Sequence, residues 1–189
     1  MRWSLPLLVL VASGCASYEL DGVAAFSSVQ SEAPEDVSPF FDDEAGVRVA
    51  VNASRSIATP GLLRGSGGNG LRGNISLSGS RYDGNGDSEL TIISPQIGPS
   101  FRLSAANLFA EAGATGGAAI ATVDTRVGDD DEFTWAARPY LRAGVIGDWF
   151  FAGVEGGYEI TGLDFGVGPA GEDYENWYVG VLVGFRLTN

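Results

Sequence analysis

The segment Asp83-Gly84-Asn85-Gly86-Asp87 places three oxygen-bearing side chains at alternate positions, as the first half of a calcium-binding loop does. Such a loop needs glycine at its sixth position and glutamate at its twelfth, where this chain has Ser88 and Ser94. A hairpin turn accounts for the same residues, because Asn-Gly and Asp-Gly are favoured in tight turns between strands. We therefore expect a turn, and treat weak, millimolar calcium binding as a hypothesis. Its candidate ligands are Asp83, Asn85, Asp87, Asp129, Asp130 and Asp131.

Arginines and glutamates also occur singly along the polar side of segments whose other side is apolar. Inside a narrow barrel these side chains would meet as ion pairs. The expected interior set is Arg48, Arg102, Glu111, Arg138, Arg142, Glu155, Glu159 and Arg186. With Arg72 added, six arginines face three glutamates, so other polar groups, water or aspartates at strand ends must complete the pairing. A tight turn joins segment 133–146, which carries Arg138 and Arg142, to segment 149–161, which carries Glu155 and Glu159. We therefore expect the arginines to pair with the glutamates across this hairpin.

The overall composition excludes several functions. All 11 basic residues are arginine, and the chain contains no histidine. Because imidazole is the only side chain whose ordinary pKa lies near neutrality, hydrolases that pair a nucleophile with histidine are excluded. The 24 acidic residues give a formal net charge of −13, which disfavours nucleic acid as a partner. The chain is therefore expected neither to be an enzyme nor to bind nucleic acid.

Apolar and polar residues alternate with a period of two along most of the chain, which is the pattern of strands with two different faces. In the last such segment Val179, Val181 and Val183 share one side, while Gly180 and Arg186 lie on the other. The expected strands are 18–28, 44–57, 71–82, 89–103, 107–123, 133–146, 149–161 and 176–187. The pattern predicts an all-β domain of eight strands.

The connections between these segments are of two alternating kinds. Four are acidic, at 29–43, 83–88, 124–132 and 163–175, and the others lie at 58–70, 104–107 and 147–148. An antiparallel up-and-down sheet sends the acidic loops to one end and the other connections, with both termini, to the opposite end. With their strand edges, the acidic loops carry eighteen of the 24 acidic residues and a single arginine. Such a rim would repel lipopolysaccharide unless divalent cations bridge the two, or would attract a cationic partner.

The apolar faces meet either lipid or the core of a soluble protein. Aromatic residues gather near both strand ends, which favours a membrane because amphipathic rings prefer its two interfaces. They are Phe101, Phe109, Trp149, Phe150, Phe151 and Phe185 at the turn end, and Phe133, Trp135, Tyr174, Trp177 and Tyr178 at the loop end. Each run is also about as long as the 9 to 11 residues of a tilted membrane strand. The alternative is a soluble lipocalin-like barrel or sandwich, with Val179, Val181 and Val183 inside.

Residues 95–114 (PQIGPSFRLSAANLFAEAGA) read as consecutive barrel strands, and 175–187 (ENWYVGVLVGFRL) as a closing strand. On these stretches the chain resembles the small eight-stranded outer-membrane β-barrel proteins of Gram-negative bacteria, a class that includes the OmpA transmembrane domain. The resemblance implies an eight-stranded antiparallel up-and-down transmembrane β-barrel surrounded by outer-membrane lipid. Enzymes of this class generally use a catalytic histidine, which this chain lacks.

Eight strands enclose only enough room for their own side chains, so we expect a filled interior. This favours a structural or surface-interaction role in the cell envelope. Two alternatives remain from the sequence: a narrow pore or small-ligand-binding barrel, and a soluble periplasmic lipocalin-like lipoprotein.

The chain begins with an export signal, in which one arginine precedes an apolar run too short to span a bilayer. The string VASGC that follows resembles the lipobox of bacterial lipoproteins, with Ala12 where that family usually has leucine. This resemblance implies that Cys15 is lipidated and anchors the protein to the outer membrane. The expected division is a signal peptide at 1–14 and one barrel domain at 15–189, in which 15–43 show the weakest strand pattern.

Overall fold

The part of the chain that the structure describes consists almost entirely of antiparallel strands. The computed structural model describes residues 18–29, 45–58, 69–84, 88–125, 128–162 and 173–187. The strands are β1 (Tyr18–Val29), β2 (Ala45–Ala58), β3 (Gly70–Asp83), β4 (Glu89–Ala105), β5 (Leu108–Thr125), β6 (Gly128–Ile146), β7 (Phe150–Gly162) and β8 (Asp173–Leu187). The eight predicted strands are confirmed, including β1, whose sequence pattern is the weakest. Within these residues, no helix is long and apolar enough to span a membrane.

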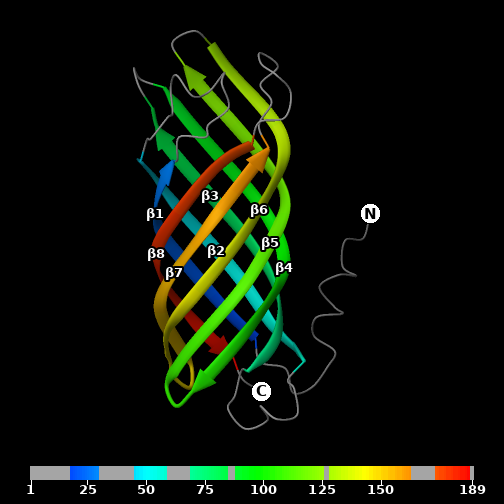
Figure 1. The fold of residues 1–189 in the computed structure, drawn as a ribbon, viewed down its shortest axis with the longest axis vertical. Helices are drawn as coiled ribbons and strands as arrows, with labels where there is room; N and C mark the ends of the chain where they lie inside the picture. The colour runs from blue at the N-terminus through cyan, green and yellow to red at the C-terminus, as the bar shows by residue number, and fades with distance from the viewer. Residues whose placement is uncertain are drawn as a thin grey trace.

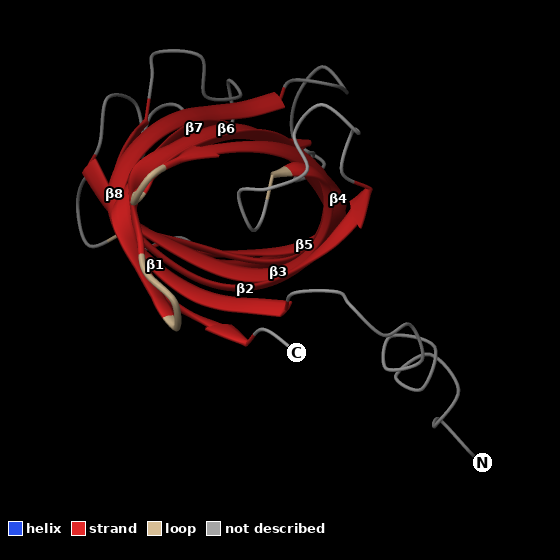
Figure 2. Ribbon diagram, turned by 90° about the horizontal axis from the view of Figure 1, so that it is seen from below, coloured by secondary structure: helices blue, strands red, loops and turns tan. Residues whose placement is uncertain are grey.

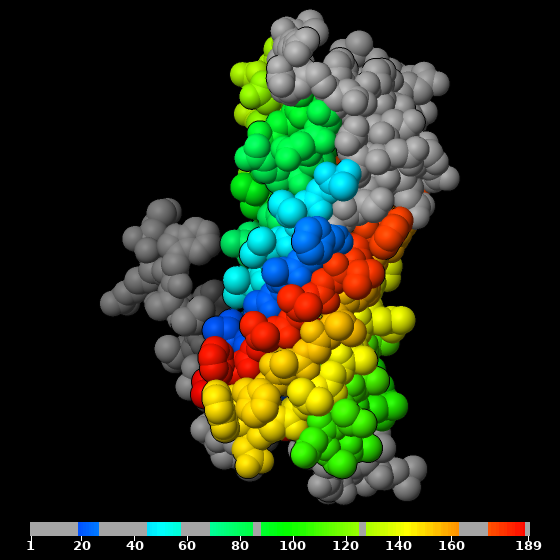
Figure 3. All heavy atoms as spheres, turned by 90° about the vertical axis from the view of Figure 1, so that its left-hand side faces the viewer, coloured from blue at the N-terminus to red at the C-terminus, as the bar shows by residue number. Residues whose placement is uncertain are grey.

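The strands close into one barrel, in which each pairs with its chain neighbours and β1 pairs with β8. Figures 1 and 2 show them slanting around a closed ring. The strands are staggered around the ring. If paired residues are followed from Phe185 of β8 through every other strand in turn, the path returns to β8 at Glu175, ten residues earlier in the sequence. Figure 3 shows the resulting oblique bands of β1, β8 and β7, side by side. An eight-stranded barrel of this kind is filled by its own side chains.

The two ends of the barrel differ in their connections. β1 begins and β8 ends at one end, where Tyr18 pairs with Leu187. The short turns after β4 and β6, at 106–107 and 147–149, lie at this end, which we call the turn end. Strands β1, β3, β5 and β7 end at the opposite end of the barrel, which we call the loop end. The strand ends that border the acid-rich connections therefore lie at one end of the barrel, as the up-and-down order predicts.

The outward face of the barrel is apolar and the inward face is largely polar. Val179, Val181 and Val183 expose 54%, 61% and 66% of their surface, whereas Gly180 and Leu182 between them are buried. Arginine, glutamate, serine and asparagine fill most of the buried polar positions. The lipocalin-like arrangement, which places the three valines inside, is therefore wrong.

Aromatic side chains form two outward belts. The outward rings include Phe101, Trp149, Phe150 and Phe185 near the turn end, and Phe26, Phe133, Trp135 and Trp177 near the loop end. The expectation that Phe109, Phe151, Tyr174 and Tyr178 belong to these belts is wrong, because all four are buried inside. Phe109 and Phe151 meet edge to face with ring centroids 6.0 Å apart, and Tyr174 meets Tyr82 in the same way at 5.5 Å. Large rings fill the interior between its charged groups, as close packing requires.

The β5–β6 hairpin extends further at the loop end than the sequence indicates. β5 ends at Thr125 and β6 begins at Gly128, so the predicted loop at 124–132 is wrong for most of its length. Residues 129–131 lie in β6 and pair with 122–124 of β5. Acidic residues argue against a strand only where one of its faces must be apolar. A ribbon that projects beyond the membrane has both faces in water, so it can be acidic and still form paired strands.

Candidate functional site

Eleven charged side chains lie inside the described barrel, and we call them the interior charge network. They are Glu19, Asp21, Glu111, Glu155 and Glu159 with Arg48, Arg72, Arg102, Arg138, Arg142 and Arg186. Ten of them expose 3% or less of their surface, while the side chain of Arg186 is 10% exposed. All eight residues expected inside from the sequence are among them. Because an unpaired buried charge costs several kcal/mol, removing one partner from a pair in this network is expected to destabilise the barrel.

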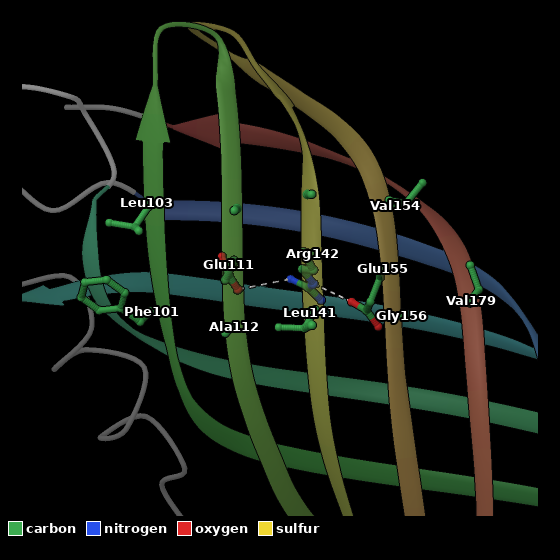
Figure 4. A pocket seen from close by; sticks show the side chains of 12 residues that line it. Phe101, Leu103, Glu111, Ala112, Leu141, Arg142, Val154, Glu155, Gly156 and Val179 are labelled. Atoms are coloured by element: carbon green, nitrogen blue, oxygen red, sulfur yellow. Dashed lines mark hydrogen bonds and ion pairs between the residues drawn. The ribbon is translucent and has the colours of Figure 1, made fainter.

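Arg142 of β6 lies at the centre of the network. Its Nε donates to Glu155 across the β6–β7 hairpin, where the two residues are in register. Its Nη1 lies 2.9 Å from Oδ2 of Asp21 and 3.8 Å from Oε1 of Glu111. Figure 4 shows Arg142 between Glu111 and Glu155, whereas Val154 points away from them on the outer face. One guanidinium therefore joins carboxylates from three strands.

Glu155 links this centre to the loop-end half of the interior. Its Oε1 accepts a hydrogen bond from the Tyr178 hydroxyl at 2.8 Å and one from Nη1 of Arg48 at 3.4 Å. Arg48 also lies over the ring of Tyr178, 4.6 Å from its centroid. The Nε of Arg48 is 3.7 Å from Oε2 of Glu159, a longer ion pair. Glu155 therefore holds two arginines and a tyrosine at once.

Glu19 of β1 connects the arginines at the turn end. Its Oε2 lies 3.1 Å from Nη2 of Arg72 and also accepts a hydrogen bond from Nη1 of Arg102. Its Oε1 lies 3.6 Å from Nε of Arg186. Arg102 in turn bonds Oε2 of Glu111, from Nε at 2.7 Å and from Nη2 at 2.6 Å. The network thus runs without a break from the end of β8 to the carboxylates of β7.

Arg138 differs from the other arginines of the network. Its Nη2 donates to Ser76 Oγ at 3.2 Å, and its Cζ lies 5.8 Å from the ring centroid of Tyr140. Its Nε and Nη1 have no hydrogen-bond partner, and none of the described carboxylates forms an ion pair with it. The expectation that Arg138 pairs with a glutamate across the β6–β7 hairpin is therefore wrong. The guanidinium extends across the barrel to β3 instead.

Glu19 and Asp21 are missing from the network expected from the sequence. With these two carboxylates, six arginines face five acids rather than three. Both residues lie on the opposite side of β1 from Leu20, which is 53% exposed, so strand parity alone identifies them as inward. The inward side of β1 also carries Val23 and Ala25, which weakens the contrast between its two faces.

The first group of candidate calcium ligands lies at the β3–β4 connection. Asp83 is exposed, and its Oδ1 accepts a hydrogen bond from Nε of Arg81 at 3.2 Å. Asn85 and Asp87 lie outside the described residues, as does Cys15. Calcium binding by this segment and lipidation at Cys15 therefore stay predictions.

The second group of candidate ligands lies near the tip of the β5–β6 hairpin. Asp129 and Asp131 share one side of β6 and Asp130 is on the other, since strand side chains alternate. A hydrogen bond shared with Asp124, together with the negative charge of that residue, raises the pKa of Asp129. Thr122 donates to Oδ1 of Asp131 at 2.7 Å. Throughout the described part of the chain, no group of three or more acidic side chains is arranged to hold a metal ion.

A shallow groove of about 570 Å³ runs along the outer face above Glu111, Arg142 and Glu155. Its floor is formed by alanines and a glycine of β5, β6 and β7, and its sides include Phe101 and Val179. The groove is apolar and lies between the two aromatic belts. It is therefore part of the surface that faces hydrocarbon in a membrane.

No protein-family model matches the chain, and no curated protein matches its sequence. Its structure is similar to that of Neisserial surface protein A (NspA), with a TM-score of 0.63 and 13% identity over 92% of this chain and 99% of that one. It is also similar to Ail, the attachment invasion locus protein of Yersinia pestis, in complex with the heparin analogue sucrose octasulfate, with a TM-score of 0.56 and 13% identity over 91% and 99% of the two chains. The outer membrane enzyme PagL gives a TM-score of 0.54 and 12% identity over 89% and 99%. The chain thus has the fold of the small outer-membrane β-barrels.

Proposed function

We propose that the chain is a non-enzymatic β-barrel of the bacterial outer membrane, anchored by lipid at Cys15, with a structural or surface-interaction role in the cell envelope. The observation that carries this proposal is the reversal of inside and outside, with an apolar outer face and buried charges. Water would make that outer face unfavourable, whereas hydrocarbon suits it. The two belts of outward rings lie where membrane interfaces are expected.

The absence of catalysis is part of the proposal. Similar structures include that of an enzyme, so the fold alone does not decide the question. The chain contains no histidine, and the carboxylates of the interior charge network are buried and engaged with arginines. A substrate would have to displace those ion pairs to reach an acid or a base. The network is better suited to holding the strands together.

The surface role rests on the acidic loop end. The β5–β6 hairpin exposes Asp129, Asp130 and Asp131 on a paired ribbon. A cationic partner, or lipopolysaccharide bridged by divalent cations, fits this charge. The structure of Ail was determined with a heparin analogue, a polyanion. Because the present chain has a net charge of −13, we do not propose a ligand of that kind.

Extraction of a Cys15→Ser variant tests the membrane barrel separately from the lipid anchor. We expect the variant to stay in the outer-membrane fraction after alkaline carbonate, because the barrel itself spans the bilayer. We also expect the unheated protein to migrate differently from the boiled protein in detergent electrophoresis. Release of the variant by carbonate, with no heat-dependent change in migration, would show a soluble protein that is held only by its lipid.

A narrow pore is the second candidate, favoured by the ion pairs that connect Arg186 near the end of β8 with Glu155 and Glu159 of β7. We expect no steady ion conductance in planar bilayers, since the same side chains fill the barrel. The decisive measurement compares the parent protein with Arg138→Gln and Arg142→Gln. If the parent protein conducts steadily and either substitution abolishes the conductance, the protein is a pore and the structural role is wrong.

A further inference from the structure

The turn end of the interior holds more positive charge than its carboxylates neutralise. Arg72, Arg102 and Arg186 all converge on Glu19. Arg102 has a second carboxylate in Glu111, which also lies 3.8 Å from an arginine of β6. Arg72 and Arg186 have only Glu19 as an ion-pair partner among the described residues. Arg72 and Arg186 therefore share the single carboxylate of Glu19 with Arg102.

Several hydrogen-bond donors of Arg72 and Arg186 have no acceptor among the described residues. Nη2 of Arg72 donates to Ser54 Oγ at 2.8 Å, but among the described residues Nε and Nη1 have no hydrogen-bond partner although the side chain is fully buried. Nε of Arg186 also lacks a partner, since 3.6 Å to Glu19 is too long for a hydrogen bond. Buried polar groups almost always have partners, and an unsatisfied charged donor is especially unfavourable. These nitrogens therefore call for an acceptor that the described residues do not supply.

The position and chemistry of the pair indicate which acceptor fits. Arg186 lies next to the last residue of β8, and its 10% exposed side chain is the most accessible in the interior charge network. Water would satisfy hydrogen bonds but would leave the excess charge in place. An oxyanion supplies both negative charge and several acceptor oxygens, which guanidinium groups bind well.

We propose that a small oxyanion of the phosphate or sulfate class binds at the turn end of the barrel, between Arg72 and Arg186. A free inorganic ion and a phospholipid headgroup share this chemistry. The site is independent of the surface role proposed for the loop end. Glu19 competes with the ligand for the same guanidinium groups, which keeps the arginines in place when the ligand leaves.

Calorimetry in a phosphate-free detergent tests the site with inorganic phosphate and sulfate, at an ionic strength held constant with sodium chloride. We expect saturable binding to one site. Arg186→Gln should weaken it by at least about tenfold, the effect of losing one charge-assisted hydrogen bond. Arg81→Gln is the matched control, because Arg81 is exposed on the outward side of β3 near the loop end and should leave binding unchanged.

A second variant and a second medium complete the test. Glu19→Gln removes the competing charge and should bind phosphate more tightly; if it does not fold, the Arg186→Gln comparison stands by itself. Urea unfolding in phosphatidylglycerol vesicles is compared with unfolding in phosphate-free glycolipid vesicles. Saturable heat from inorganic phosphate or sulfate assigns the free ion, and stabilisation confined to phosphatidylglycerol and lost in Arg186→Gln assigns the headgroup. No response in either medium, or equal responses from the parent and Arg186→Gln, would overturn the proposal.

Discussion

Glu155→Ala is expected to lower the free energy of unfolding by about 3 to 5 kcal/mol, the usual effect of breaking a buried ion pair. The substitution removes the acceptor of Arg142 across the hairpin and one acceptor of Arg48. It also leaves the buried hydroxyl of Tyr178 without its 2.8 Å bond. Arg142 keeps its ion pairs with Asp21 and Glu111, and Arg48 keeps a longer one with Glu159, so the loss comes from the hydrogen bonds that Glu155 alone accepts.

Urea unfolding in liposomes measures the effect, with Glu159→Ala as the control. Glu159 lies on the same side of β7 and is equally buried, but neither of its oxygens has a hydrogen-bond partner and its ion pair with Arg48 is 3.7 Å long. Glu159→Ala should therefore lower the free energy of unfolding by clearly less than Glu155→Ala does. Equal losses from the two variants would mean that the pairs of Glu155 carry no special weight, and an unchanged midpoint would contradict the prediction outright.

Val181→Arg is expected to destabilise the barrel in liposomes by about 2 to 4 kcal/mol, because a charge near the middle of the lipid face must leave water for hydrocarbon. Val181 is 61% exposed on the outward face of β8 and pairs with Val154 and Ala24 in the neighbouring strands. In a barrel surrounded by water the same substitution would change the free energy of unfolding by no more than about 0.5 kcal/mol. The measurement therefore reports which solvent this face meets.

Leu187→Arg is the matched control, on the same face of the same strand. Leu187 is 70% exposed and lies at the turn end, six residues or about 20 Å along β8 from Val181. Near a membrane interface the cost should fall to about 0 to 1 kcal/mol. If Val181→Arg and Leu187→Arg both lower the free energy of unfolding only slightly, the outer face does not meet a membrane. If both lower it by several kcal/mol, the two residues do not lie at the different membrane depths assumed here.

The outer face is the most predictable part of this protein. Side chains of a strand alternate strictly, so the spacing of Val179, Val181 and Val183 determines that they share a face. A slip of one residue would place the whole row inside, which makes the parity of each strand difficult to mistake. The same rule identifies Arg142 and Glu155 as inward, and the tight turn between β6 and β7 brings them into register.

Contacts across the barrel are less predictable. Glu19 and Arg102 are 83 residues apart, and they meet only because β1 closes against β8 and the register is offset around the ring. Arg138 reaches Ser76, 62 residues away, although a glutamate of the next strand is nearer in sequence. The direction of a long flexible side chain in a crowded interior depends on all of its neighbours together. Parity indicates which residues enter the interior, but it does not assign their partners.

The position of Glu19 and Asp21 in the first strand has a consequence for folding. Their partners belong to other strands, Arg72 to β3, Arg102 to β4 and Arg142 to β6. Before β1 is in place, the six arginines of the interior share three carboxylates. Closing the seam between β1 and β8 therefore completes the hydrogen-bonded ring and, in the same step, reduces the excess of arginines over carboxylates from three to one. A barrel with β1 undocked lacks the two carboxylates that pair with Arg72, Arg102 and Arg142, which favours the closed form over the open one.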